Sequence, residues 1–288
     1  TAFFAHSADL VARMAHATGR SNEVRYYTDL AGRIKGAFHR AFVAEDGTIE
    51  GNTQAGYALA LSFDLLPDAL RSKAASLLVQ NIHRYNEHLS TGIQTTHRAM
   101  LELVRAEHQD IAWQLLTNRS FPSWFYMLDN GATTVWERWD GYVKGRGFQD
   151  PGMNSFNHWA FGAVGEWIWR HVAGLNPDDR SPGWKHFVVA PRPGGGVTWA
   201  RADYGSIRGR ISVHWWLSET DFFLRLSIPP NTTADVRLPV ASASGVLESG
   251  KPWRDSPNVS RVAAPPGEIV FRVESGRYLF RAPRRSPN

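Results

Sequence analysis

The sequence predicts an α + β protein with two domains, a toroid-type helical domain built from (α/α) hairpins followed by an antiparallel β-sandwich. Apolar residues recur at helical spacing as far as residue 174, in paired segments separated by short turns. Beyond residue 182 they alternate with polar residues in short runs rich in Val, Ile and aromatics. Pro, Asp and Gly cluster between these regions, at 176–183, so we expect domains at 1–180 and 181–288.

The helical half contains about seven segments. Gly19 ends the first, and Gly174 ends the last. Pro67 stands where a first-turn proline is tolerated. The segment 53–66 is apolar almost all round, which predicts a helix buried on most sides. The expected helices are 3–18, 22–42, 53–66, 67–85, 96–106, 109–118 and 156–173.

The second half contains short runs with a period of two, separated by turn residues, which is the pattern of an antiparallel sandwich. Alternation should place one of Trp215 and Trp216 in the core and leave the other as an accessory platform for sugar. The expected strands are 186–190, 209–217, 221–228, 234–238, 268–273 and 277–281.

Composition excludes several classes of protein. There is no cysteine, so disulfides and thiolate metal sites are absent, and the histidines form no zinc motif. We therefore expect no cofactor and no metal. No apolar run approaches the roughly 20 residues needed to span a bilayer, so no membrane partner is expected. The start of the chain carries no signal-peptide pattern, and the compartment stays open.

The net charge of +5 comes from the second half of the chain. Residues 1–177 carry 16 Lys and Arg against 17 Asp and Glu, whereas residues 178–288 carry 16 against 10. These basic residues are scattered among opposite charges along the expected strands. This pattern indicates solvated faces rather than a nucleic-acid partner.

Chemistry is concentrated in residues 131–141, Gly-Ala-Thr-Thr-Val-Trp-Glu-Arg-Trp-Asp-Gly, where Glu137 stands between Trp136 and Trp139. Six of the twelve tryptophans, Trp124 included, fall between residues 124 and 169. Flat apolar faces beside carboxylates suit a sugar ring, whose C–H face stacks on aromatics while its hydroxyls need acceptors. The alternative is a helix start with core tryptophans and a capping glutamate.

A second polar group follows within about two dozen residues. Asn154, Asn157 and His158 are embedded among Phe156, Trp159 and Phe161. A single histidine on an aromatic helix is more often a core residue, but the presence of this polar group nearby strengthens the sugar-site interpretation of residues 131–141.

The runs 121–124, 131–141 and 153–167 together resemble bacterial α-L-rhamnosidases of glycoside hydrolase family 78. The likeness extends from residue 3 to about residue 239 and is densest between 89 and 174. It implies that the chain corresponds to the carboxy-terminal portion of such an enzyme, comprising part of the helical catalytic barrel and the terminal β-domain.

The resemblance also implies roles for individual residues. In this family, which hydrolyses with inversion, the glutamate of the matching Trp-Glu-Arg-Trp motif is the general base, so Glu137 is the expected base. It also implies that His158 contacts the rhamnose hydroxyls. Around these two, Trp124, Trp136, Trp139 and Asn157 are candidates for substrate binding. Asp140 is either a further candidate, orienting Arg138 or Glu137, or a helix cap.

Two features depart from the family. The general-acid motif has no match, with Glu50, Glu87 and Asp129 as unranked substitutes, and the loop 92–97 differs from the usual pattern. The helices are too few for a six-hairpin toroid, which needs twelve. The chain is therefore expected to be a fragment that associates with a missing amino-terminal portion, or a short relative that closes its barrel as a homo-oligomer.

Three functions remain open. The first is an inverting hydrolase that releases terminal α-L-rhamnose. The second is a non-catalytic carbohydrate-binding or assembly module derived from such an enzyme. The third is another toroid glycosidase, such as a glucoamylase-like enzyme.

Overall fold

The computed structural model describes residues 1–265 and 267–284. The chain forms two compact units, Thr1–Val164 and Gly165–Asn288. The first unit is helical, and the second is built mainly from strands, as predicted. No helix in the described ranges is long and apolar enough to cross a membrane.

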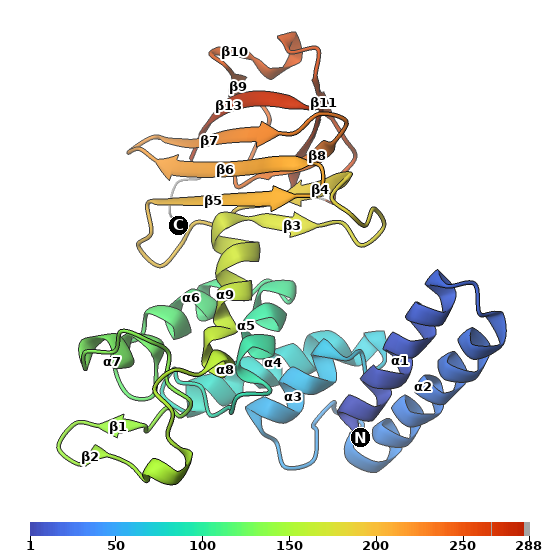
Figure 1. Ribbon diagram of the computed structural model, residues 1–288, viewed down its shortest axis with the longest axis vertical. Helices are drawn as coiled ribbons and strands as arrows, with labels where there is room; N and C mark the ends of the chain where they lie inside the picture. Colours follow the sequence, from blue (N-terminus) through green and yellow to red (C-terminus); the bar gives the residue numbers. More distant parts are fainter. Residues whose placement is uncertain (266, 285–288) are drawn as a thin grey trace. The chain divides into compact units, whose positions relative to one another are not determined.

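The first unit consists mainly of helical hairpins. Helices α1 and α2 form one hairpin, α3 packs against α4 and α5, and α5 packs against α6 (Figure 1). The helices end within a few residues of their predicted limits. Their bounds are α1 (Ala2–Ala17), α2 (Ser21–Phe42), α3 (Gln54–Ser62), α4 (Asp68–Arg84), α5 (Thr96–Arg105) and α6 (Gln109–Thr117).

Helix α3 is the buried helix that its composition predicts. The side chain of Thr53 accepts a hydrogen bond from the backbone N–H of Gly56 and so caps its first turn. Tyr57, Ala58 and Ala60 are fully buried. The apolar character on most sides of this helix is therefore matched by neighbours, including α4 and α5.

The region between α6 and the end of the first unit is mostly loop. It contains the short helix α7 (Trp124–Asp129), the hairpin of β1 (Tyr142–Val143) and β2 (Gly147–Phe148), the 3₁₀ turn η1 (Pro151–Met153) and helix α8 (Trp159–Gly162). The predicted helix 156–173 is divided into α8, α9 (Val164–Trp167) and the π-helix η2 (Ile168–Ala173).

The helical run that follows Val164 packs with the strands of the second unit. Helix η2 contacts β3, β5 and β6, and the indole Nε1 of Trp215 donates a hydrogen bond to the carbonyl of Val172 (2.6 Å). The second unit therefore begins at Gly165, before the Pro, Asp and Gly cluster from which the sequence predicts a boundary near residue 180. Helical periodicity does not show which unit a helix packs against.

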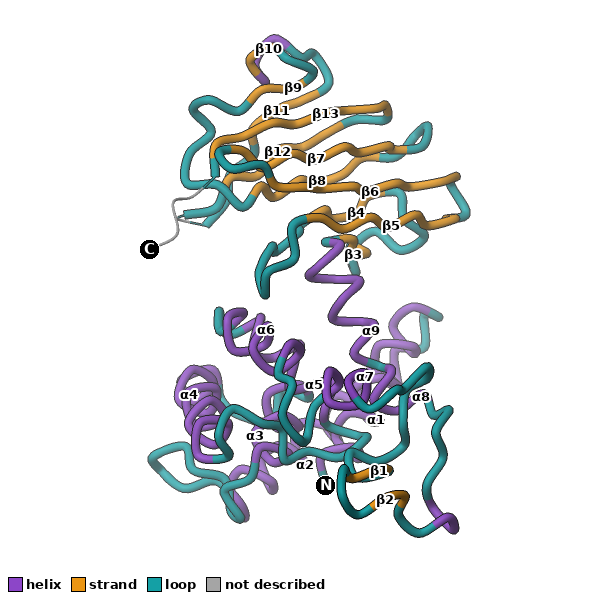
Figure 2. The backbone as a smooth tube through the Cα atoms, turned by 90° about the vertical axis from the view of Figure 1, so that its left-hand side faces the viewer, coloured by secondary structure: helices purple, strands orange, loops and turns teal. Residues whose placement is uncertain are grey.

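Two sheets build the second unit (Figure 2). One has six strands in the order β10-β9-β13-β7-β6-β5, and the other has five in the order β11-β12-β8-β4-β3. All pairs are antiparallel except β4 with β8. The bounds are β3 (Leu175–Pro177), β4 (His186–Val189), β5 (Trp199–Ser206), β6 (Gly209–Leu217), β7 (Asp221–Ile228), β8 (Thr233–Leu238), β9 (Leu247–Glu248), β10 (Lys251–Pro252), β11 (Val259–Arg261), β12 (Ile269–Val273) and β13 (Gly276–Pro283).

The core of this unit lies between the two sheets. Phe271 on β12 stacks against Phe280 on β13, with ring centroids 6.1 Å apart, and both are fully buried. Strand alternation on β6 buries Trp215 completely and turns Trp216 to the opposite face. The prediction that only one of this pair is core is confirmed.

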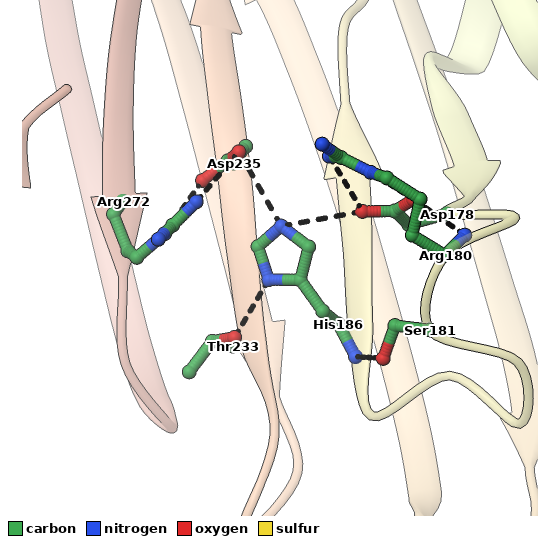
Figure 3. Close-up of polar contacts among 7 residues, drawn as sticks. All are labelled: Asp178, Arg180, Ser181, His186, Thr233, Asp235 and Arg272. Carbon is green, nitrogen blue, oxygen red and sulfur yellow. Dashed lines mark hydrogen bonds and ion pairs between the residues drawn. The ribbon is translucent and has the colours of Figure 1, made fainter. Parts of the chain in front are cut away.

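A polar cluster links three strands of the five-stranded sheet, β4, β8 and β12 (Figure 3). The His186 ring lies between Thr233, whose Oγ1 is 2.7 Å from Nδ1, and Asp235, whose Oδ2 is 3.3 Å from Nε2. Arg272 donates two hydrogen bonds to Asp235 (2.9 and 3.0 Å). Burial alone favours protonation of Asp235, but the Arg272 hydrogen bonds and nearby positive charges outweigh it and lower the pKa. A charged carboxylate thus joins β4, β8 and β12.

Protonation of His171 on η2 should make stability depend on pH. Burial, together with the charges of Arg192 and Arg170, lowers the pKa of His171 from 6.5 to about 4. The folded state therefore binds fewer protons than the unfolded state between these values. The resulting stabilisation is complete above pH 6.5 and is lost as the pH falls toward 4, by about 3 kcal/mol.

We expect thermal unfolding of the second unit to shift to lower temperature between pH 6.5 and pH 4, and His171→Gln to remove most of that slope. Calorimetric scans of both proteins at half-unit pH intervals would test this expectation. An unchanged slope in the variant would contradict it.

Candidate functional site

Residues 131–141 form a loop between α7 and β1. No helix begins there, so the helix-start alternative does not describe this stretch. The chain after Asp140 enters β1 and turns at Gly145 and Gly147, both with positive φ. The motif therefore occupies irregular backbone, where side chains can converge from more than one direction.

This loop is paired with the second polar motif through the backbone. The N–H of Glu137 donates to the carbonyl of Ser155 (2.8 Å), and the N–H of His158 donates to the carbonyl of Val135 (2.9 Å). In addition, the Thr134 hydroxyl donates to the carbonyl of Phe156. Two motifs about twenty residues apart in sequence thus lie side by side.

The Glu137 carboxylate is held through one of its oxygens. Its Oε2 accepts a hydrogen bond from the backbone N–H of Ser155 (3.0 Å). Its Oε1 accepts none from any described residue, and the residue is half-buried. One oxygen is fixed and the other remains available, an arrangement that suits a group that must orient and deprotonate a small molecule.

Arg138 does not pair with Glu137. Its guanidinium donates to both oxygens of Asp140 (3.0 and 2.9 Å), a bidentate ion pair within one turn of loop. Asp140 thus orients Arg138, and its role in substrate binding stays a prediction. Of the two neighbouring charges, it is Asp140 and not Glu137 that the arginine neutralises.

Trp136 and Trp124 lie mainly in the core. They are 4% and 7% exposed, and the indole Nε1 of Trp124 donates to the carbonyl of Phe161 (3.0 Å). Trp136 meets the rings of Tyr142 and Phe156 edge to face. Both indoles have little surface left for the predicted contacts with substrate, and core packing explains the burial of both residues.

Trp139 joins the motif to a distant loop. Its indole Nε1 donates to the carbonyl of Thr91 (3.0 Å), and its ring stacks on Phe161 with centroids 3.9 Å apart. Thr91 precedes the loop 92–97, whose sequence departs from the family pattern. Trp139 is half-buried, so one ring face is engaged in packing, and its predicted substrate contact is untested.

His158 caps helix α8. Its Nδ1 accepts a hydrogen bond from the backbone N–H of Ala160 (3.2 Å), which places the proton of the neutral ring on Nε2. No described residue bonds to Nε2, so this N–H can donate to a ligand. Asn157 beside it is exposed, and its side chain has no hydrogen-bond partner among the described residues.

The loop that carries Glu137 depends on close approach at Gly141. The side-chain amide of Asn154 donates to the carbonyl of Gly141 (2.9 Å). A β-carbon at position 141 would stand only 2.7 Å from Asn154 Oδ1. A larger residue at position 141 would therefore force the Asn154 amide to move.

The three carboxylic acids suggested as substitutes for the missing general acid have other environments. Glu87 pairs with His83 (2.5 Å), Asp129 pairs with Arg119 (2.5 Å), and Glu50 is exposed. The second carboxyl oxygen of Glu87, Oε2, is buried and has no hydrogen-bond partner among the described residues. No hydrogen bond or ion pair among the described residues links any of the three acids to Glu137. Nor does the described part of the chain hold a group of three or more His, Asp or Glu side chains that fits a metal ion.

Sequence reasoning did not single out Ser155 or Trp159. Ser155 acts through its backbone N–H, which any residue would supply, so its identity carries no signal. Trp159 is 72% exposed next to His158, and in sequence it is indistinguishable from the buried tryptophans around it. Its ring therefore has free surface beside His158.

The chain belongs to the bacterial alpha-L-rhamnosidase family of glycoside hydrolases. The family's 6 hairpin glycosidase domain matches residues 1–172, and its C-terminal domain matches residues 174–251. This assignment confirms the resemblance seen in the sequence motifs and gives no support to the glucoamylase-like alternative.

Individual relatives carry the same family name. An alpha-L-rhamnosidase of Streptomyces avermitilis is 46% identical over 97% of this chain, and one of Formosa agariphila is 34% identical over 98%. The crystal structure of the Streptomyces enzyme complexed with L-rhamnose superposes with a TM-score of 0.90 over 98% of the chain. The structure of the Dictyoglumus thermophilum enzyme superposes with a TM-score of 0.87 over 99% of the chain at 29% identity. The chain spans only 26–31% of the length of these proteins.

Trp139→Phe should destabilise the helical unit. The substitution leaves the buried carbonyl of Thr91 without its donor and opens space beside Phe161, at a cost of about 2–4 kcal/mol. Trp159→Phe, a matched change at an exposed indole, should cost under about 0.5 kcal/mol. Urea unfolding of both variants measures the difference, and equal costs would show that the Thr91 contact does not hold the loop.

Proposed function

We propose that this chain supplies the base-bearing part of an inverting α-L-rhamnosidase, in which Glu137 activates a water molecule against terminal α-L-rhamnose. Inversion needs one ionised carboxylate that takes a proton from water and one acid that protonates the leaving oxygen. Glu137 is a candidate for the first role only.

The observation that carries the proposal is the asymmetric environment of Glu137. Ser155 fixes Oε2, while Oε1 has no partner among the described residues, and the nearby guanidinium of Arg138 is committed to Asp140. The carboxylate is thus oriented by one backbone hydrogen bond, and its second oxygen is left for a water molecule. The relative from Streptomyces avermitilis, which was crystallised with L-rhamnose, supports the substrate class.

His158 is proposed to bind a rhamnose hydroxyl. Its Nδ1 is occupied by the Ala160 N–H, so Nε2–H is the donor that remains. The backbone bond between His158 and Val135 fixes the ring relative to Glu137, because Val135 lies two residues before the carboxylate. Asn157 and Trp159 are the adjacent groups with free surface.

We propose that the general acid and the remaining helices of the barrel come from protein outside residues 1–288. Helix α1 buries a face of small residues, Ala5, Ala8, Ala12 and Ala15. Its large apolar residues remain exposed: Phe3 at 41%, Phe4 at 58%, Leu10 at 37% and Met14 at 59%. Exposed apolar residues along one helix are typical of a surface that further helices cover. An amino-terminal portion or a second copy of the chain would supply them.

Glu137→Gln should abolish turnover without loss of the fold. In a preparation in which the barrel is complete, we expect kcat on an aryl α-L-rhamnoside to fall about 10²- to 10⁴-fold, because the amide cannot accept the proton of water. The Ser155 hydrogen bond survives, since the amide oxygen still accepts it. Glu45→Gln, an exposed carboxylate elsewhere in the same unit, is the matched control and should retain activity.

Release of nitrophenol measures this expectation, with circular dichroism to confirm folding. Retention of more than a tenth of wild-type kcat by Glu137→Gln would contradict the base assignment. Rhamnose binding without turnover in every assembly would instead support the non-catalytic carbohydrate-binding alternative.

A further inference from the structure

Four arginines gather on the outer face of the six-stranded sheet. They come from four strands: Arg201 on β5, Arg210 on β6, Arg225 on β7 and Arg277 on β13. Together they line a hollow of about 700 Å³ with His214, Ser212 and Ser227. In the sequence these arginines are separated by up to 76 positions, 201 to 277, and look scattered.

Strand register explains the gathering. His214 lies opposite Arg201 on one side and Arg225 on the other, and Arg277 lies opposite Ser227. Side chains directly opposite one another share a sheet face, about 5 Å apart. The buried residues between them, such as Val213 and Leu226, point to the core. The arginines therefore project together from one surface.

The hollow is electropositive. No Asp or Glu is among the described residues that line it. Asp203 on β5 pairs with Arg201 and Arg210 (3.0 and 3.1 Å). By contrast, Arg225 and Arg277 have no carboxylate within ion-pair distance in residues 1–265 and 267–284. Burial, followed by the charges of Arg225 and Arg201, lowers the pKa of His214. A site with two unneutralised guanidinium groups attracts an anion.

Aromatic rings border this hollow along the strands. Trp199 is 61% exposed and lies opposite Trp216, which stacks on Phe223 with ring planes 2° apart. The Arg225 guanidinium carbon lies 5.5 Å from the Trp216 ring centroid, a cation–π arrangement that holds it over the face. This surface thus presents the exposed Trp199 indole beside guanidinium groups, of which that of Arg225 is held against Trp216.

We infer that this face binds an acidic oligosaccharide, whose carboxylate or sulfate groups pair with Arg225 and Arg277 while a sugar ring stacks on Trp199. Guanidinium groups recognise planar or tetrahedral oxyanions through paired N–H donors, and an indole offers its face to sugar C–H groups. The arginines fill one compact hollow rather than a long stripe, which favours a short anionic chain over nucleic acid. These residues belong to the second unit and Glu137 to the first, and the inference does not depend on the proposed catalysis.

Titration calorimetry with three hexasaccharides tests the inference: hexagalacturonate, sulfated maltohexaose and neutral maltohexaose. We expect the intact chain to bind at least one acidic hexamer at least tenfold more tightly than maltohexaose, and the tighter of the two identifies the anionic group. Arg225→Gln/Arg277→Gln should weaken that binding at least tenfold, and Trp199→Ala at least threefold. Glu137→Gln should leave it unchanged.

Arg261→Gln, an exposed strand arginine in the other sheet, is the control for charge and should change affinity less than twofold. If Arg261→Gln and the double variant lost the same amount of affinity, net charge alone would explain the binding and the inference would be overturned. Equal affinity for neutral and acidic hexamers would also overturn it. So would tighter binding of a single-stranded hexadeoxynucleotide than of either acidic hexamer.

Discussion

The candidate site depends on backbone pairing between residues 134–137 and residues 155–158. These two backbone hydrogen bonds involve no side chain, yet they set the positions of Glu137 and His158 relative to each other. Trp136 forms a buried apolar cluster with Met127 and Phe161, against which Val135 and Phe156 of the two segments pack.

Charge in the second unit is organised by the same kind of constraint. Register, rather than sequence proximity, determines which charged side chains meet. On one sheet it joins Asp235 to His186 and Arg272 and so stabilises the fold. On the other it gathers Arg225 and Arg277 with no carboxylate partner among the described residues. The charge of Asp235 is thus neutralised within the protein, whereas the guanidinium groups of Arg225 and Arg277 can pair with a ligand.

Much of the fold could be predicted from sequence because periodicity reports burial. The apolar faces of α2 and α3 and the alternation along β6 and β7 gave their limits within a few residues. Strand β5 was missed because its Gly, Asp and Arg residues hide the alternation, and α7 was too short to show a period. Within the site, Glu137 and His158 were visible through motif spacing. The Ser155 contact was not, because a backbone N–H leaves no trace in residue identity.

The central claim is that Glu137 delivers water to the anomeric carbon and never bonds to it. Proton NMR of the first rhamnose released from an aryl α-L-rhamnoside tests this most directly, in a preparation with a complete barrel. Water attack with inversion gives the β-anomer first, followed by slow mutarotation. Initial release of the α-anomer, with a glycosylated peptide containing Glu137 detected by mass spectrometry, would contradict the account.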